Sequence, residues 1–205
     1  MADANSCRME LEANGIQTRH RQWLARLVAT RRIVILPSAN ALGYYRNTRE
    51  EGNVDPNRDF PFVLTDPSKC MQTIAGRTLN EVFREHMIQL SLTFHGGMEV
   101  VAYEWGAPTF LNYDSPDDTA QHDIASAYSQ YGGGWTESHN YEFGTMNDLV
   151  YYVRGGMEDW AYAASWDPER VIQCKPTQFN GHPVEKTRYN NSTLRVFNML
   201  LGRNV

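Results

Sequence analysis

The chain has 205 residues, of which 41% are hydrophobic and 21% are charged, and its formal net charge is -5 at pH 7. This length suits one domain with a substantial buried core, and the composition is typical of a globular protein rather than a disordered one. The acidic balance argues against non-specific binding to nucleic acid, and no apolar stretch approaches the roughly 18 residues of a membrane span.

The first residues and the cysteines carry little signal. Residues 1–15 are polar and weakly patterned, so we expect a poorly ordered N-terminal segment followed by one α/β domain over residues 16–205. No apolar core of a signal peptide is present in this segment, which leaves the cytoplasm as the default compartment. Cys7, Cys70 and Cys174 are widely spaced, and three such cysteines predict neither a disulfide framework nor a cysteine-rich zinc site. No pattern indicates an oligomeric state.

The first two expected elements are a helix and a strand. Apolar residues recur at helical spacing over Thr18–Arg31, which predicts a helix. Ile33–Leu36 is a continuous apolar run closed by Pro37, and this pattern favours a central strand covered on both faces. A helix that leads into such a strand indicates an α/β layout.

A long polar loop separates this strand from the next elements. Residues 38–66 are rich in Asn, Arg, Gly and Pro, and a loop of this length in a compact domain is usually functional. Asp66-Pro67 then begins a second predicted helix. One side of that helix would carry Met71, Ile74, Val82 and Phe83. The β-leaning run Ile88–Phe94 follows and ends in His95, Gly96 and Gly97.

The second half of the chain has clear helix signals and one irregular stretch. Glu99–Trp105 is a further candidate strand, and Asp117 or Asp118 can cap a helix that runs to Tyr131. Residues 135–166 are aromatic, rich in glycine and irregular, which makes them a second candidate binding loop. The remaining expected elements are a strand over Val171–Cys174 and a helix capped by Ser192 that carries Leu194, Phe197 and Leu201.

The polar loop contains arginines that suit an anion. Arg46 and Arg49 flank Asn47 and Thr48, and Asn57-Arg58 follows within the run Val54–Pro61. A guanidinium offers paired donors that match a carboxylate, and an Asn amide adds a neutral donor. The alternative is an arginine paired with an acidic residue of the same loop, Asp55 or Asp59, which would only fasten the loop. Both readings stay open.

Two further stretches could supply chemical groups. His95 stands at a strand end, where sheet proteins often present a ligand or catalytic group, although a histidine held by backbone hydrogen bonds is the more common outcome. Gly155-Gly156 followed by Asp159-Trp160 suggests a tight turn that aims an acidic group into a site. Packing of Trp160 explains the same pattern equally well.

These motifs, in this order, resemble the zinc carboxypeptidases of the carboxypeptidase A/B type. The resemblance covers roughly Thr18 to Cys174. It rests on Leu36 to Tyr44, Arg46, Val54 to Pro61, His95, and Tyr151 to Trp160. It implies an α/β fold with a mixed, mostly parallel central sheet flanked by helices, incomplete at the N-terminus, with its completeness at the C-terminus left open.

The resemblance also implies a zinc cofactor, a peptide C-terminus as substrate, and roles for individual residues. His95 corresponds to the third zinc ligand, and Arg46 to the arginine that polarises the scissile carbonyl. Asn57 and Arg58 correspond to the pair that grips the C-terminal carboxylate of the substrate. Tyr151, or Tyr152 one residue later, corresponds to the tyrosine that closes over the substrate. Asp159 corresponds to an acidic position in the specificity loop.

Two parts of the family's active site are not found. The family's first zinc motif, His-x-x-Glu, should precede the first strand, but the only histidine before Ile33 is His20, with no glutamate three residues on. The two His-x-x-Glu spacings that do occur, at His139 and His182, come after His95. The apolar segments after Trp160 contain no glutamate that could serve as general base, and the nearest candidate is Glu185, in a polar loop.

We therefore expect a carboxypeptidase-like protein that hydrolyses C-terminal peptide bonds weakly or not at all. Catalytic zinc needs three protein ligands, and one imidazole supplies one of them. The alternative is a pseudo-peptidase that binds C-terminal carboxylates without cutting, and a third possibility is a fragment without function. The pocket beside residues 155–159 carries both Arg154 and Glu158, so the substrate's side-chain preference is left open.

Overall fold

The computed structural model describes residues 18–132, 140–163, 174 and 197–203. The chain divides into two compact units, residues 1–38 and residues 39–205, which are treated separately below. No described helix is long and apolar enough to cross a membrane. The expected disorder of residues 1–15 and the strand expected over residues 171–173 lie outside the described residues.

The first unit contains the predicted helix but not the predicted strand. Helix α2 spans Thr18–Thr30, close to the expected bounds. The prediction of a central strand at Ile33–Leu36 is wrong: these residues form no strand, and their exposed fractions range from 39% to 78%. An apolar run indicates a tendency to be buried. A strand also needs a hydrogen-bonded neighbouring strand, and no described residue pairs with Ile33–Leu36.

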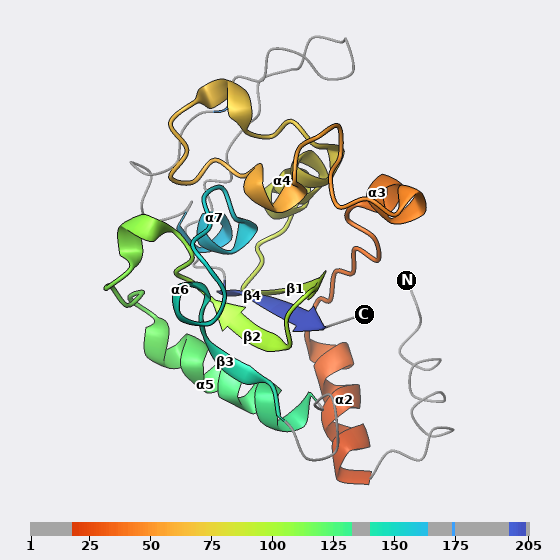
Figure 1. Cartoon of the computed structure of the whole chain (residues 1–205). Helices are drawn as coiled ribbons and strands as arrows, with labels where there is room; N and C mark the ends of the chain where they lie inside the picture. The colour runs from red at the N-terminus through yellow and green to blue at the C-terminus, as the bar shows by residue number, and fades with distance from the viewer. Residues whose placement is uncertain (1–17, 133–139, 164–173, 175–196, 204–205) are drawn as a thin grey trace. The chain divides into compact units, whose positions relative to one another are not determined.

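The second unit is built on a four-stranded sheet with the order β1-β4-β2-β3 (Figure 1). Strand β4 pairs in parallel with β1 and antiparallel with β2, and β2 pairs in parallel with β3. The strands are β1 Leu90–Gly96, β2 Val100–Tyr103, β3 Glu142–Thr145 and β4 Phe197–Arg203. This mixed, mostly parallel sheet with flanking helices confirms the predicted fold class.

The prediction of a last helix over Leu194–Leu201 is wrong where the structure describes it. Phe197 begins strand β4 and pairs with Leu90, and Leu201 pairs with Phe94. Its register on β2 is set by the pairs Val101 with Leu201 and Ala102 with Leu200. Backbone partners on both sides therefore decide the conformation, because tertiary context overrides the weak local preference for helix. Residues 192–196 lie outside the described part.

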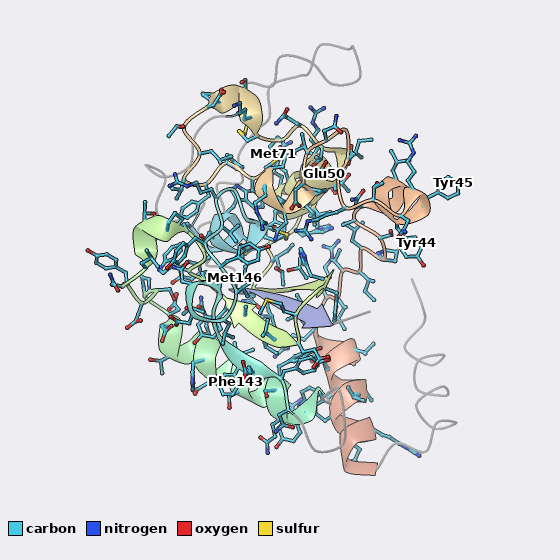
Figure 2. The ribbon with its side chains drawn as sticks, in the orientation of Figure 1. Tyr44, Tyr45, Glu50, Met71, Phe143 and Met146 are labelled. Atoms are coloured by element: carbon cyan, nitrogen blue, oxygen red, sulfur yellow. A yellow bond between two sulfur atoms is a disulfide. The ribbon has the colours of Figure 1, made fainter. Side chains whose placement is uncertain are left out.

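The loop predicted over residues 38–66 contains two short helical elements, α3 at Ala41–Arg46 and η1 at Pro56–Arg58. Asn40 caps α3 by accepting a hydrogen bond from the Gly43 N–H, and Asn47 ends it in the left-handed conformation. Tyr44 and Tyr45 of α3 point away from the ribbon in Figure 2 and are 87% and 86% exposed.

The predicted helix that begins at Asp66 is interrupted. A single turn, η2 at Pro67–Lys69, is followed by extended Cys70 and by Met71 with a φ of 52°. Helix α4 then spans Ile74–Glu85 and is capped by Thr73, whose hydroxyl accepts from the Gly76 N–H. Met71 therefore lies outside the helix: Asp66 caps the separate turn η2, and Thr73 caps α4.

The later helices surround the sheet. Helix α5 spans Asp118–Tyr131 and ends at Gly132, as the sequence predicts. The stretch predicted to be irregular, residues 135–166, instead contains β3, α6 at Met146–Leu149 and α7 at Met157–Ala163. A short turn, η3, lies at Pro108–Phe110.

Strand β2 is buried on both faces, as expected of an interior strand. Val101 and Tyr103 pack with Ala125 of α5 on one face. On the other face Val100 and Ala102 pack with the cluster that contains Met146, which is labelled in Figure 2. A separate core cluster joins α4 and α7 through Phe60, Phe83 and Trp160, with ring centroids of Phe60 and Trp160 5.0 Å apart.

A disulfide joins Cys70 to Cys174 across a sequence separation of 104 residues. The prediction that the cysteines form no disulfide is therefore wrong for this pair. Spacing in the sequence gave no signal, since bonding depends on how near the two Cα atoms lie, and here they are 5.6 Å apart. Both cysteines belong to the core cluster of α4 and α7.

Glu104, at the end of β2, is a fully buried acid. Its Oε1 accepts a hydrogen bond of 3.0 Å from the side-chain amide of Gln121, while its Oε2 has no described partner. Burial raises the pKa of Glu104 well above its usual range, and the nearby acids Asp159 and Glu158 act in the same direction. The folded protein thus keeps this proton at pH values where the unfolded chain has lost it.

We predict that Glu104→Gln stabilises the protein at alkaline pH. Above the ordinary glutamate pKa the folded state binds more protons than the unfolded state, so the free energy of unfolding falls as pH rises toward the folded pKa. Each unit of difference in pKa costs about 1.4 kcal/mol. Denaturant unfolding at pH 4 and pH 8 should show a gain of about 1 kcal/mol or more at pH 8 and none at pH 4. The exposed Glu85→Gln variant is the control, and equal behaviour of the two variants would contradict the prediction.

Candidate functional site

Turn η1 places two of the predicted substrate-binding residues. Asp55 caps this turn: its Oδ1 accepts from the Asn57 N–H at 2.9 Å, and Pro56 occupies the first position. The other carboxylate oxygen of Asp55 accepts from Arg49 Nε at 2.6 Å. One acidic side chain thus fixes both the turn that carries Asn57 and Arg58 and the arginine that precedes it.

Asn57 is buried, with 8% of its surface exposed, and helix α7 holds its side chain. Its Oδ1 accepts from the Met157 N–H at 2.8 Å, and its Nδ2 donates to Glu158 Oε2 at 3.3 Å. These partners lie 100 and 101 residues further along the chain. The side-chain amide is therefore held by two contacts that only the folded chain can supply.

Arg58 lies beside Tyr151. Its Nη2 donates to the Tyr151 hydroxyl at 3.0 Å, and its guanidinium carbon lies 5.6 Å from the centre of the tyrosine ring. Its Nη1 donates to the Asn57 carbonyl. No described carboxylate pairs with Arg58 within salt-bridge distance, so its positive charge is available to an anion. Tyr151 is 54% exposed and Tyr152 57%, and the described hydrogen bond and ring contact of Arg58 are with Tyr151.

Gly155 allows the chain to approach this pair. Its φ is +69°, and a Cβ at this position would lie 2.4 Å from the Arg58 carbonyl oxygen. The Phe60 N–H donates to the Gly155 carbonyl at 3.0 Å, and the Gly155 N–H donates to the Phe62 carbonyl at 3.1 Å. Only glycine combines this backbone conformation with so close an approach.

His95 is the second-to-last residue of strand β1, next to Gly96 at the strand end. Burial lowers its pKa to about 4, and the positive charges of Arg49 and Arg58 act in the same direction against the opposing charge of Asp55. His95 therefore shares its electrostatic environment with the residues around η1. Its imidazole is neutral near pH 7, which is the form that binds a metal ion.

The two arginines of the polar loop differ in where they lie. Arg46 ends helix α3 with an exposed side chain, and it is not among the charges that act on His95. Arg49 is the nearer cation: it acts on the His95 pKa and is held by Asp55. Arg49 thus fastens the loop through Asp55, as one of the two alternatives proposed, whereas the described partners of Arg58 are the Tyr151 hydroxyl and the Asn57 carbonyl.

Asp159 is held by the backbone of the segment that follows β2. It is 1% exposed, and its two oxygens accept from the N–H groups of Gly106 and Ala107 at 2.9 and 2.8 Å. Burial raises its pKa well above the usual range, and the charge of Glu158 adds to that effect. Both acceptor oxygens are thus occupied by backbone donors that hold α7 to the segment after β2.

Three residues near the site have a contact or an effect that was not predicted from the sequence. Glu158 contacts Asn57, Arg49 acts on His95, and Asp55 caps η1. Asp55-Pro56 is a recognisable cap signal, so the role of Asp55 could have been read from the sequence. The contact of Glu158 has no local signal, because its partner lies in another element.

The described residues do not form a complete zinc site. Among them, no group of three or more His, Cys, Asp or Glu side chains could hold a metal ion. His95 offers one neutral imidazole, whereas a catalytic zinc site takes three protein ligands. The two histidines in later His-x-x-Glu spacings, His139 and His182, lie outside the described residues, as does Glu185.

Comparison with known proteins gives a consistent result. The family model described as zinc carboxypeptidase matches residues 16–191. Carboxypeptidase SOL1 of Arabidopsis thaliana is 32% identical over 136 residues, which cover 62% of this chain and 28% of that protein. Human carboxypeptidase D is 32% identical over 188 residues, covering 78% of this chain and 13% of that protein. The chain thus spans less than a third of these two relatives.

The fold resembles a solved structure of the same kind. Carboxypeptidase A from Helicoverpa armigera aligns with a TM-score of 0.53 at 17% sequence identity. The alignment covers 83% of this chain and 43% of that one. At 17% identity, this structural similarity supports a shared fold and nothing further.

We predict that Arg49, and not Arg46, influences the titration of His95. Removing a positive charge that lowers the His95 pKa should let that pKa rise, so Arg49→Met should raise it above about 4. Arg46→Met should leave it unchanged. An NMR titration of histidine-labelled protein measures both. A rise in the Arg46 variant alone would contradict the placement of the two arginines.

Proposed function

The chain belongs to the zinc carboxypeptidase family, and we propose that Asn57, Arg58 and Tyr151 form a site that recognises the C-terminal carboxylate of a peptide. The observation that carries this proposal is the guanidinium of Arg58, which has no described carboxylate partner and lies 3.0 Å from the Tyr151 hydroxyl. We call Asn57, Arg58 and Tyr151 the carboxylate clamp.

The chemistry of the clamp suits a carboxylate. Arg58 supplies a permanent positive charge with donors in a fork, which match the two oxygens of a carboxylate. The phenol of Tyr151 can turn from Arg58 toward a bound ligand because its ring is 54% exposed. Asn57 adds a neutral donor beside the guanidinium. These groups bind an anion without requiring a metal.

We propose Arg49 as the cation that faces the peptide carbonyl, in the role that the family resemblance places at Arg46. Support comes from its action on the His95 pKa and from the 2.6 Å bond to Asp55, which holds the guanidinium in place. A preorganised positive charge near His95 would stabilise negative charge that develops on the carbonyl oxygen.

Peptide hydrolysis is the second proposed function, and it depends on ligands beyond the described residues. When bound, zinc in this family supplies an activated water. His95 is the candidate ligand in this chain, and its neutral imidazole is in the right protonation state. The described residues provide no second and third ligand, so we derive no hydrolytic step from them.

We propose residence in an oxidising compartment in place of the cytoplasmic default. The buried Cys70–Cys174 disulfide supports this proposal, since disulfides persist outside the cytosol and are rare within it.

We predict that Arg58→Met abolishes the preference for a free C-terminus. Calorimetry would use acetyl-Gly-Gly-Phe and acetyl-Gly-Gly-Lys, each as the free acid and as the amide. A hydrogen bond to a charged group contributes about 1.5–3 kcal/mol. The acid should therefore bind about 10- to 100-fold more weakly to the variant, with the amide unchanged.

The matched control is Lys69→Met, which removes an exposed positive charge outside the clamp. It should leave the preference for the acid intact. Equal affinity of the unaltered protein for the acid and the amide would contradict the proposed recognition of a C-terminal carboxylate.

We also predict that the 205-residue chain holds less than one zinc per molecule and turns over these peptides slowly or not at all. Elemental analysis after dialysis and an assay of released amino acid would measure both. Stoichiometric zinc that is lost in His95→Ala, together with turnover, would instead show that residues outside the described part complete the site.

A further inference from the structure

We propose that Glu158 is a positioning residue that sets the orientation of the Asn57 side-chain amide in the carboxylate clamp. The inference rests on the proposed recognition of a C-terminal carboxylate. It goes beyond that recognition by naming the residue that makes Asn57 a donor rather than an acceptor toward the ligand.

The two ends of an asparagine amide have nearly the same shape, but one end accepts hydrogen bonds and the other donates them. A carboxylate offers acceptors only, so Asn57 can contribute to the clamp only with its NH₂ group toward the ligand. An amide free to flip would spend part of its time with its oxygen toward the ligand, where two acceptors would repel.

Helix α7 removes this freedom through two contacts of opposite kind. The Met157 N–H can only donate, and it lies 2.8 Å from Asn57 Oδ1. Glu158 Oε2 accepts from Asn57 Nδ2 at 3.3 Å. A flip would set the NH₂ group against the Met157 N–H and the amide oxygen against the carboxyl oxygen of Glu158. Both contacts therefore favour one orientation.

This arrangement leaves one donor for a ligand. Nδ2 carries two hydrogens, and one of them is directed to Glu158. The second is the hydrogen that a bound carboxylate would meet. Because Asn57 is only 8% exposed, few orientations of the amide other than the observed one can find partners in water.

The carboxyl group of Glu158 is itself confined. It is 1% exposed, and a Cβ at Gly156 would lie 2.1 Å from Glu158 Oε1. The second glycine of the pair therefore leaves room for the carboxyl group against the backbone. Burial raises the pKa of Glu158, but a neutral carboxyl group still has a carbonyl oxygen that accepts from Asn57 Nδ2. In that form the Met157 N–H, which can only donate, is the contact that excludes the flip.

The experiment compares Glu158→Gln, Glu158→Leu, Asn57→Leu and the double variant Asn57→Leu/Glu158→Leu. The readout is the ratio of affinities for acetyl-Gly-Gly-Phe as free acid and as amide. Glu158→Gln keeps an acceptor oxygen and should retain the ratio of the unaltered protein. Glu158→Leu should lower the ratio about three- to tenfold, by the loss of one hydrogen bond. The double variant should be no worse than Asn57→Leu alone, because Glu158 acts through Asn57.

A second measurement does not depend on the peptide. The side-chain NH₂ signals of Asn57 in a ¹⁵N spectrum should move in Glu158→Leu and stay near their original positions in Glu158→Gln. If Glu158→Leu does not fold, judged by thermal unfolding, Glu158→Gln alone still tests the idea, since a loss of the acid preference in that variant contradicts it.

The outcomes separate the two proposals. Equal affinity of the unaltered protein for acid and amide defeats the carboxylate recognition, and the NMR signals then decide the orientation by themselves. Three outcomes would each contradict the positioning role. They are an unchanged acid preference in Glu158→Leu, additive losses of that preference in the double variant, and Asn57 NH₂ signals that do not move in Glu158→Leu.

Discussion

The site depends on one close approach, that of the Gly155 backbone to the segment from Asn57 to Phe62. Two backbone hydrogen bonds, to Phe60 and Phe62, hold the segments together, and the glycine at 155 lets them meet without a side chain between them. With the two segments held together, α7 contacts Asn57, and Tyr151 contacts Arg58. A side chain at position 155 would therefore disturb several contacts at once, although it touches no ligand.

Three acidic side chains lie buried in the core of the second unit. Glu104, Glu158 and Asp159 are each at most 1% exposed, and burial raises the pKa of all three. They nonetheless have distinct partners: Gln121 for Glu104, Asn57 for Glu158, and two backbone N–H groups for Asp159. Buried polar groups of this kind cost stability but restrict the number of ways in which neighbouring segments can pack.

Short-range sequence patterns predicted the elements whose conformation depends mainly on neighbouring residues. Helix α5 was predicted from a capping aspartate at its start and Gly132 at its end, and the ordered motifs identified the family. Several failures involve partners distant in the chain. Phe197–Arg203 has helical spacing but becomes a strand between β1 and β2, and Ile33–Leu36 has a strand-like composition but no described neighbour. The bond of Cys70 to Cys174 and the contact of Glu158 with Asn57 are likewise set by the fold.

The strand order has a consequence for how the protein is made. Strands β1 and β2 are consecutive in the chain, yet they are not neighbours, because β4 lies between them. A ribosome releases β1 and β2 long before Phe197–Arg203, so the centre of the sheet must wait for the last strand to be synthesised. Contacts between such distant segments form slowly, and the waiting edges are open to other chains. Recombinant yield should therefore respond to growth temperature and chaperone supply more than to the stability of the finished protein.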